Sequence, residues 1–184
     1  MFKIKFRIVD DIELLSSMST KIFDDEYDQI LGFFQINFGS HQEGSYYHEN
    51  QLMEGEEGGE LLDYWFDKIL QVIISLDSEA DYVAFKELET VNRWIDFTKK
   101  GDNVFINVAV DDTCQNNNLI ITEKYQFSYI EPLNYVLSYQ ALKNQIREVS
   151  EKFLIELEHI NPDLCKTKMY KVLKQKLDII QNYI

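Results

Sequence analysis

The chain has 184 residues, of which 45% are apolar and 14% aromatic, and it contains seven glycines and two prolines. This composition predicts a single domain over residues 1–184 and excludes a disordered, collagen-like or low-complexity chain. The formal net charge is −14, and the two cysteines, Cys114 and Cys165, form no paired motif. No apolar run reaches the roughly 18 residues of a membrane helix, and the N-terminus lacks a secretory pattern, so we expect a cytoplasmic protein.

The acidic residues are concentrated in one third of the chain. Residues 10–67 hold fifteen of the 32 acids and a single base, Lys21, which accounts for the whole net charge. The other residues hold 17 acids and 17 bases and are neutral overall. Concentrated negative charge raises the encounter rate with basic partners. A solubilising surface would have the same composition, so both interpretations stay open at this point.

The first elements follow from alternation of apolar and polar residues. Residues 2–9 (FKIKFRIV) predict a half-buried strand with Lys3, Lys5 and Arg7 on its polar face. Residues 14–23 fit either a short helix or a loop.

A polar turn is expected over 24–28 (DDEYD), followed by a second strand over 29–39. Residues 43–50 (EGSYYHEN) are expected to pair back on that strand as a hairpin, because glycines at 39 and 44 provide a turn. Residues 51–59 read as a loop.

A helix is predicted from near Gly59, because apolar residues recur at three- and four-residue steps. They are Leu62, Trp65, Phe66, Ile69, Ile73 and Leu76. Four further strands are then expected, over 81–88, 93–100, 103–110 and 123–130, with a tight turn at Lys100-Gly101-Asp102. Pro132 would close this sheet region.

Two helices are predicted at the end of the chain. The first runs over 139–160 and is stopped by Asn161-Pro162. The second covers about 163–182, with a basic polar face formed by Lys166, Lys168, Lys171, Lys174 and Lys176. The order of elements predicts an α+β fold, in which a mainly antiparallel sheet packs against helices, two of them C-terminal.

Catalytic and metal-binding patterns are weak. His41 and His48 lie seven residues apart with Glu43 and Glu49 nearby, but no HExxH or paired cysteines support a zinc site. The acidic stretches lack the carboxylate spacing of a calcium loop. No GxSxG is present, and the glycines at 55–59 are flanked by acids that would repel phosphate. The sequence therefore predicts no enzyme, no metal and no cofactor.

The aromatic residues of the acidic segment suit a protein interface. Tyr46 and Tyr47 lie within the expected hairpin, next to His48. Tyrosine rings supply contact area, while surrounding charges steer association. Because neighbours on a strand alternate, one of the two tyrosines is expected to face the core.

Four stretches resemble bacterial immunity proteins of polymorphic-toxin and contact-dependent growth inhibition systems. They are LGFFQINFG, EGSYYHEN, GGELLDYWFDKIL and NRWIDFTKKGDNVFINV, followed by a long helix. The resemblance implies a cytoplasmic protein without activity of its own that binds and blocks a toxin domain, often a nuclease. Such families diverge at their interfaces, so the resemblance assigns no binding residue.

The charge pattern supplies the candidate site instead. We expect acids to steer and pair with a basic toxin domain, and the two tyrosines with His48 to pack at the centre. The candidate partner-binding residues are Asp24, Asp25, Glu26, Glu43, Tyr46, Tyr47, His48, Glu49, Glu54, Glu56 and Glu57. Direct nucleic-acid binding is disfavoured here, because phosphates need basic counter-charges. No membrane partner is expected.

Two alternatives remain. One is an acidic mimic of nucleic acid, or a regulatory adaptor, that occupies basic grooves without a toxin partner. The other is an enzyme whose site is assembled in space around His41 and His48.

Overall fold

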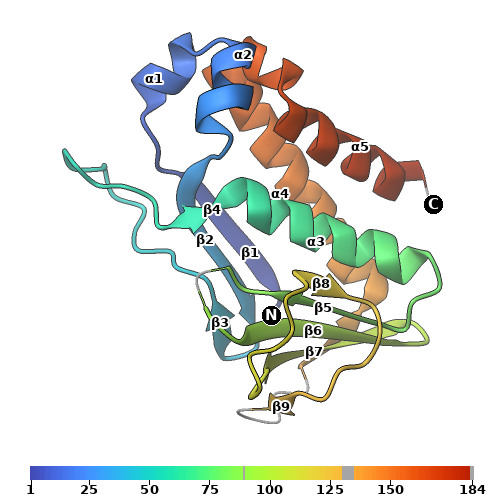
Figure 1. Ribbon diagram of the computed structural model, residues 1–184. Coiled ribbons are helices and arrows are strands. Elements are labelled where there is room, and N and C mark those ends of the chain that lie inside the picture. Colours follow the sequence, from blue (N-terminus) through green and yellow to red (C-terminus); the bar gives the residue numbers. More distant parts are fainter. Residues whose placement is uncertain (89, 130–134, 183–184) are drawn as a thin grey trace.

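A computed structural model describes residues 1–88, 90–129 and 135–182. The described residues form two antiparallel sheets and three long helices. Figure 1 shows that the sheets meet at an angle and that the helices pack beside them. The α+β class, the antiparallel pairing and the two C-terminal helices are confirmed. The predicted strands divide between two sheets.

The first sheet is built from the N-terminal third of the chain. Its order is β1-β2-β3, and β4 pairs with β2 beyond the end of β3. Its strands are β1 (Lys3–Ile8), β2 (Leu31–Phe38), β3 (His41–Glu43) and β4 (Glu60–Leu61). The predicted faces of β1 are confirmed, since Ile4 and Phe6 are buried while Lys3 is exposed.

The second sheet follows in the middle of the chain. Its order is β10-β7-β6-β5-β8, and β9 pairs with β7. Its strands are β5 (Tyr82–Lys86), β6 (Arg93–Lys100), β7 (Asn103–Val110), β8 (Ile120–Ile121), β9 (Ser128–Tyr129) and β10 (Tyr135–Ser138).

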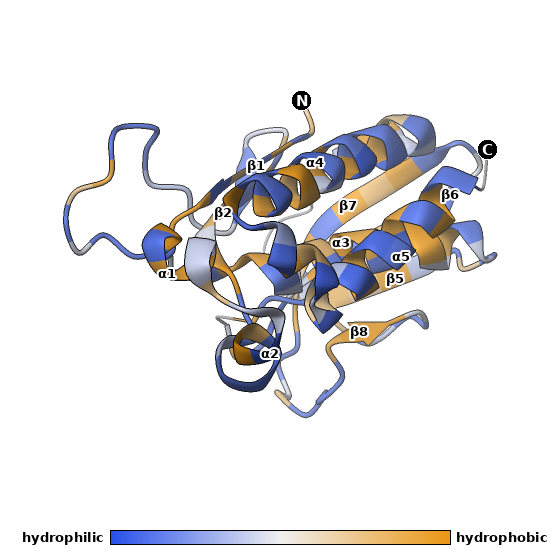
Figure 2. Cartoon of the chain, turned by 90° about the horizontal axis from the view of Figure 1, so that it is seen from above, coloured by the Kyte–Doolittle hydropathy of each residue, from blue (hydrophilic) through white to orange (hydrophobic). Residues whose placement is uncertain are grey.

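Three long helices accompany the sheets: α3 (Leu62–Asp77), α4 (Tyr139–Ile160) and α5 (Lys168–Asn182). Shorter helical segments are α1 (Ile12–Ser17), α2 (Thr20–Ile22), a π-helical turn η1 (Phe23–Tyr27) and a 3-10 turn η2 (Pro162–Lys166). The helices carry their hydrophobic residues towards the core and their polar residues outwards, as the colouring of α4 and α5 in Figure 2 shows.

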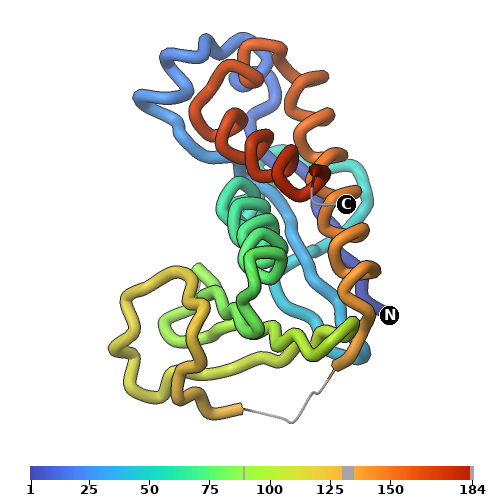
Figure 3. The backbone as a smooth tube through the Cα atoms, turned by 90° about the vertical axis from the view of Figure 1, so that its right-hand side faces the viewer, coloured from blue at the N-terminus to red at the C-terminus, as the bar shows by residue number. Residues whose placement is uncertain are grey.

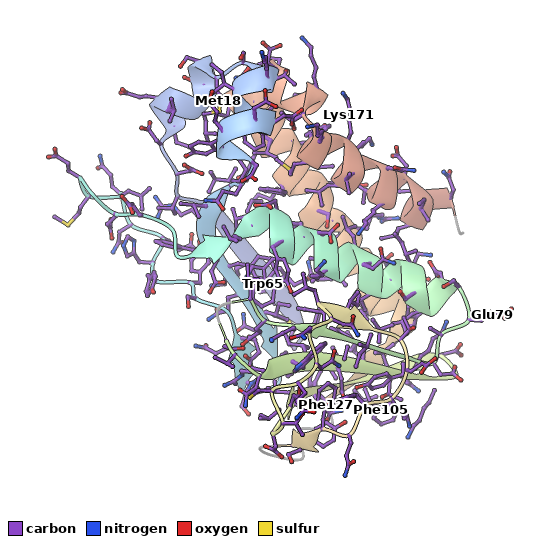
Figure 4. All side chains as sticks on the ribbon, viewed as in Figure 1. Met18, Trp65, Glu79, Phe105, Phe127 and Lys171 are labelled. Carbon is purple, nitrogen blue, oxygen red and sulfur yellow. The ribbon has the colours of Figure 1, made fainter. Side chains whose placement is uncertain are left out.

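Aromatic side chains join the helices to both sheets. Trp65 of α3 stacks on Phe34 of β2 at 4.6 Å between ring centroids, and meets Phe85 of β5 edge to face at 5.8 Å. Figure 4 shows Trp65 between α3 and the strands. Phe66 stacks on Phe153 of α4 at 4.3 Å. One hydrophobic cluster therefore contains residues of both sheets and all three long helices.

Several local predictions were wrong. Residues 24–28 do not form a simple turn, because 23–27 make the π-helical η1. The hairpin strand is His41–Glu43 instead of 43–50, and most of the following residues are irregular.

Of the predicted strand 123–130, only the two residues of β9 form a strand among those described. The two-residue strand β8, just before this range, and the pairing of β10 with β7 were missed. Residues 130 and 132 lie outside the described residues. These short strands are held by tertiary pairing, which leaves no periodic pattern in the sequence.

Candidate functional site

Residues 44–59, called the acidic arm here, connect β3 to β4 and project from the body of the protein. Figures 1 and 2 show the arm extending sideways beyond α1, and its colouring in Figure 2 is mostly hydrophilic. Its outgoing half is held by Arg7, which donates to the backbone oxygens of His48 (3.2 Å) and Asn50 (2.7 Å). Its returning half is held where the Gly58 N–H donates to the Val9 oxygen at 3.0 Å.

The base of the arm rests on an aromatic contact. Phe33 of β2 meets the rings of Tyr46, Tyr47 and His48, with centroid distances of 5.9, 5.1 and 5.9 Å. Tyr46 is half-buried, and the amine of Lys5 lies 5.3 Å from its ring centre. Tyr47 is 69% exposed. One tyrosine of the pair therefore turns inward, although neither residue belongs to a strand.

Burial and the neighbouring Glu49 carboxylate raise the pKa of the Tyr46 hydroxyl to about 12. Tyr46 therefore stays neutral at physiological pH and contributes its ring and hydroxyl, without a charge. The aromatic base is a packed and partly exposed surface next to the acids.

A side-chain clip shapes the turn of the arm. Glu56 accepts a hydrogen bond from the Met53 N–H at 2.6 Å and lies 2.7 Å from His48 Nε2. The Met53 N–H, followed by His48, lowers the pKa of the Glu56 carboxyl. Glu56 and His48 thus serve the shape of the arm before any partner is present.

The exposed tip combines acids with one large apolar side chain. Glu49, Glu54 and Glu57 are exposed, and Met53 is 76% exposed. Carboxylates around an exposed hydrophobic residue match the anatomy of a protein interface, with an apolar centre and a polar rim.

A hollow of about 310 Å³ lies between the arm and the segment that precedes α1. Four acids line it, and its lining among the described residues contains no base. The lining consists of Val9, Asp10, Asp11, Tyr27, Leu31, Glu56 and Glu57. Asp10 accepts hydrogen bonds from the Tyr27 hydroxyl and from the Leu31 N–H (2.8 Å).

Asp10 and Asp11 belong to the acidic segment but are not among the site residues predicted from the sequence. The charge count was the signal that could have found them. What the sequence lacked was their proximity to Glu56 and Glu57, some 45 residues later in the chain.

The three acids of η1 lie apart from the arm and differ from one another. Asp25 and Glu26 are exposed. Asp24 is only partly exposed, and its carboxylate accepts the N–H of Lys168 at 2.9 Å, at the start of α5. Asp24 is thus a helix cap as well as a surface charge.

Glu43 does not belong to the exposed acidic surface, which corrects the expectation for this residue. It is 4% exposed, accepts from Arg93 at 2.5 Å, and contacts the His41 ring. Burial favours its neutral form, but hydrogen bonds from Glu87, Arg93 and His41 together lower the pKa of the Glu43 carboxyl. Its position inside an ion cluster leaves it unavailable to a partner.

The two histidines of the acidic segment belong to different clusters. His41 pairs with Glu43, whereas His48 pairs with Glu56 in the arm. Within the described part of the chain, no group of three or more His, Cys, Asp or Glu side chains is placed to hold a metal ion.

No family model matches the chain, and neither a curated protein nor a solved structure matches it significantly. Among the helices of the described residues, none combines the length and the apolar character needed to cross a membrane.

Proposed function

We propose that this protein binds a basic protein domain through the acidic arm and the hollow at its base. The observation that carries the proposal is the joining of Asp10 and Asp11 to Glu56 and Glu57 around a 310 Å³ hollow, beneath an arm with exposed acids. A surface of this kind accelerates encounters with a positively charged partner.

The mechanism divides between steering and contact. Glu49, Glu54 and Glu57 attract lysines and arginines of the partner from a distance. Tyr47 and Met53 are exposed apolar groups that the partner buries on docking. The hollow receives a cationic side chain, since four acids from two separate segments line it.

The biological role follows as part of the same proposal. Together with the resemblance to bacterial immunity proteins, the acidic surface supports an inhibitor that neutralises a toxin domain, such as a basic nuclease, in the cytoplasm. Covering a groove that binds a negatively charged substrate requires an acidic surface, which the arm supplies. An acidic mimic of nucleic acid would use the same surface, but for several unrelated binders.

Charge reversal of the arm tests the proposal. We expect the triple variant Glu49→Lys, Glu54→Lys, Glu57→Lys to slow association with the partner by about tenfold and to weaken its dependence on salt. These three side chains are exposed, so the fold is retained. Tagged protein would capture the partner from a lysate at low salt, and association rates would then be measured with the purified partner by biolayer interferometry.

A matched control carries the same change of charge elsewhere. Asp81, Glu123 and Glu158 are exposed acids outside the arm, and their reversal to lysine should leave the association rate nearly unchanged. Equal slowing of association in both triple variants would attribute binding to net charge alone and contradict a role for the arm.

An inhibitor must also rescue cells that express the captured domain. Failure to rescue would reject the toxin part of the proposal.

A further inference from the structure

The outer edge of β1 is not paired with another strand among the described residues, and it lies beside the base of the acidic arm. β1 is the end strand of the first sheet, and within the described residues its hydrogen-bonded register is with β2 alone. The outer edge of an end strand presents a row of backbone N–H and C=O groups to any strand that approaches it. Proteins commonly protect such edges by burying them or by charging them.

A groove of about 380 Å³ runs along this edge. Four consecutive residues of β1, 3 to 6, line it. Side chains of neighbouring strand residues point to opposite faces, so a groove on one face would be lined by alternate residues only. Lining by four in a row therefore places the groove along the backbone edge, over a length of about 13 Å.

The groove has a wall on each side of the strand. The helix α4 contributes Gln145, Glu148, Val149 and Lys152. Tyr46 and Glu49, from the base of the acidic arm, form the other wall. Figure 3 shows β1 running beside α4, with the N-terminus nearby.

The side chains of β1 specify what kind of peptide fits. On the face towards α4, Ile4 and Phe6 are buried, and the amine of Lys152 lies 5.1 Å from the Phe6 ring centre. On the opposite face, Lys3 is exposed and Lys5 is partly exposed. An added strand would therefore meet apolar neighbours on one face and lysines on the other.

We infer that β1 accepts an extended peptide with alternating apolar and acidic residues, which adds to the first sheet as a further strand. Its apolar side chains would continue the row of Ile4 and Phe6, and its acids would lie beside Lys3 and Lys5. Opposite charges on neighbouring strands stabilise pairing, whereas like charges oppose it. Pairing of β1 with a second copy of itself is disfavoured for that reason, because lysines would then face lysines.

This site goes beyond the proposed function and does not depend on it. The arm attracts basic partners, whereas Lys3 and Lys5 on β1 favour an acidic strand, even though the walls of the groove also contain Glu49 and Glu148. Glu49 is shared by the arm and the groove, so the peptide test is made with its side chain unchanged. Loss of peptide binding in that protein would leave the proposal for the arm untouched.

The test uses the full chain and synthetic peptides. The probe is acetyl-Val-Glu-Val-Glu-Val-Glu-amide, titrated up to about 1 mM into the ¹⁵N-labelled protein and followed by nuclear magnetic resonance. We expect saturable shift changes at residues 3–7 and on the facing part of α4. The Val-Lys version of the peptide should bind about tenfold more weakly.

Two modified peptides distinguish strand addition from simple charge attraction. One carries N-methyl groups on the valine amides and the other on the glutamate amides, so that each loses one of its two hydrogen-bonding edges. At least one of them should lose binding. If both bind as well as the parent peptide, or if the shift changes lie away from β1, the inference is overturned. Absence of any saturable change at the highest concentration also overturns it.

The protein side is tested by reversing the two lysines. The double variant Lys3→Glu, Lys5→Glu should prefer the Val-Lys peptide to the Val-Glu peptide. The control Lys124→Glu, Lys171→Glu has the same change of net charge at exposed positions outside the groove and should keep the original preference. An unchanged preference in the Lys3, Lys5 variant would contradict the role of these lysines, and circular dichroism would verify that it folds.

Discussion

At the scale of single residues, the glycines of the acidic arm differ in what surrounds them. A Cβ atom built on Gly58 would lie 2.3 Å from the backbone nitrogen of Gly32, because the returning arm crosses β2 in direct backbone contact. A Cβ on Gly44, which has a positive φ of 78°, would lie 2.5 Å from the Phe34 oxygen. By contrast, nothing lies within 4 Å of a Cβ on Gly59. Gly44 and Gly58 are thus required because a side chain would collide with the neighbouring backbone, whereas Gly59 has room for one.

Replacement of Gly58 by alanine should destabilise the protein by about 1–3 kcal/mol, since two backbone segments would have to separate. The variant Gly59→Ala is the matched control and should change stability by no more than about 0.5 kcal/mol. Urea unfolding followed by tryptophan fluorescence measures both. Equal stabilities of the two variants would show that the crossing of the arm over Gly32 is loose.

At the scale of elements, the long helices and strands were predictable from the sequence, but the contacts that attach one element to another were not. The apolar spacing of α3 and α4 and the alternation of β1, β2, β6 and β7 are properties of neighbouring residues, which the sequence displays directly. Capping is different. Asp24 lies in η1, yet its carboxylate accepts the N–H of Lys168, 144 residues later, at the start of α5.

Removal of this cap should weaken the attachment of α5. We expect Asp24→Ala to lower the free energy of unfolding by about 1 kcal/mol. Asp25→Ala removes an exposed carboxylate of the same turn without a hydrogen bond to α5, and should have little effect. Thermal unfolding by circular dichroism would compare them. Loss of stability in Asp25→Ala to the same extent would indicate a charge effect of η1 instead of a cap.

At the scale of the whole molecule, a buried ion cluster joins the two sheets. Glu43 of β3 belongs to the first sheet, Arg93 of β6 to the second, and Glu87 follows β5. The Arg93 guanidinium lies 2.5 Å from the Glu43 carboxylate and 3.7 Å from the nearer carboxyl oxygen of Glu87. Burial, followed by the hydrogen bond and charge of Glu43, raises the pKa of Glu87 to about 9. Glu87 therefore carries a proton in the folded protein at neutral pH.

This proton links stability to pH. The folded-state pKa of Glu87 lies above its ordinary value of 4.5, so the unfolded chain releases a proton that the folded protein retains. The contribution of the retained Glu87 proton to the free energy of unfolding is fully present below about pH 4.5, and it is lost as the pH rises through about 9. Glu87→Gln keeps a neutral side chain at all pH values and removes this loss.

As the pH rises from about 5 to about 8, the unmodified protein should lose free energy of unfolding that Glu87→Gln retains. We expect the difference in this free energy, variant minus unmodified protein, to increase by at least about 1 kcal/mol over that range. Urea unfolding at both pH values measures the difference. Glu123→Gln, at an exposed position, is the control and should follow the unmodified protein. Parallel pH profiles for Glu87→Gln and the unmodified protein would mean that Glu87 is already ionised in the fold.

The candidate site was only partly predictable from the sequence. The concentration of acids in residues 10–67, and the position of the aromatic pair at 46 and 47, were visible without coordinates. The sequence could not separate Glu43, which is buried against Arg93, from Glu49, which is exposed on the arm. Both are glutamates in the same polar stretch, and only their surroundings differ.

The sequence by itself determined the α+β class, the main helices and strands, and the segment that carries the net charge, because periodicity and charge are local. The tertiary structure decided which acids are exposed, which are buried and which lie together. It placed Asp10 and Asp11 beside Glu56 and Glu57, and it turned Asp24 into a cap for α5. It also left the edge of β1 open beside α4. Each of these depends on contacts between residues far apart in the chain, which no local pattern encodes.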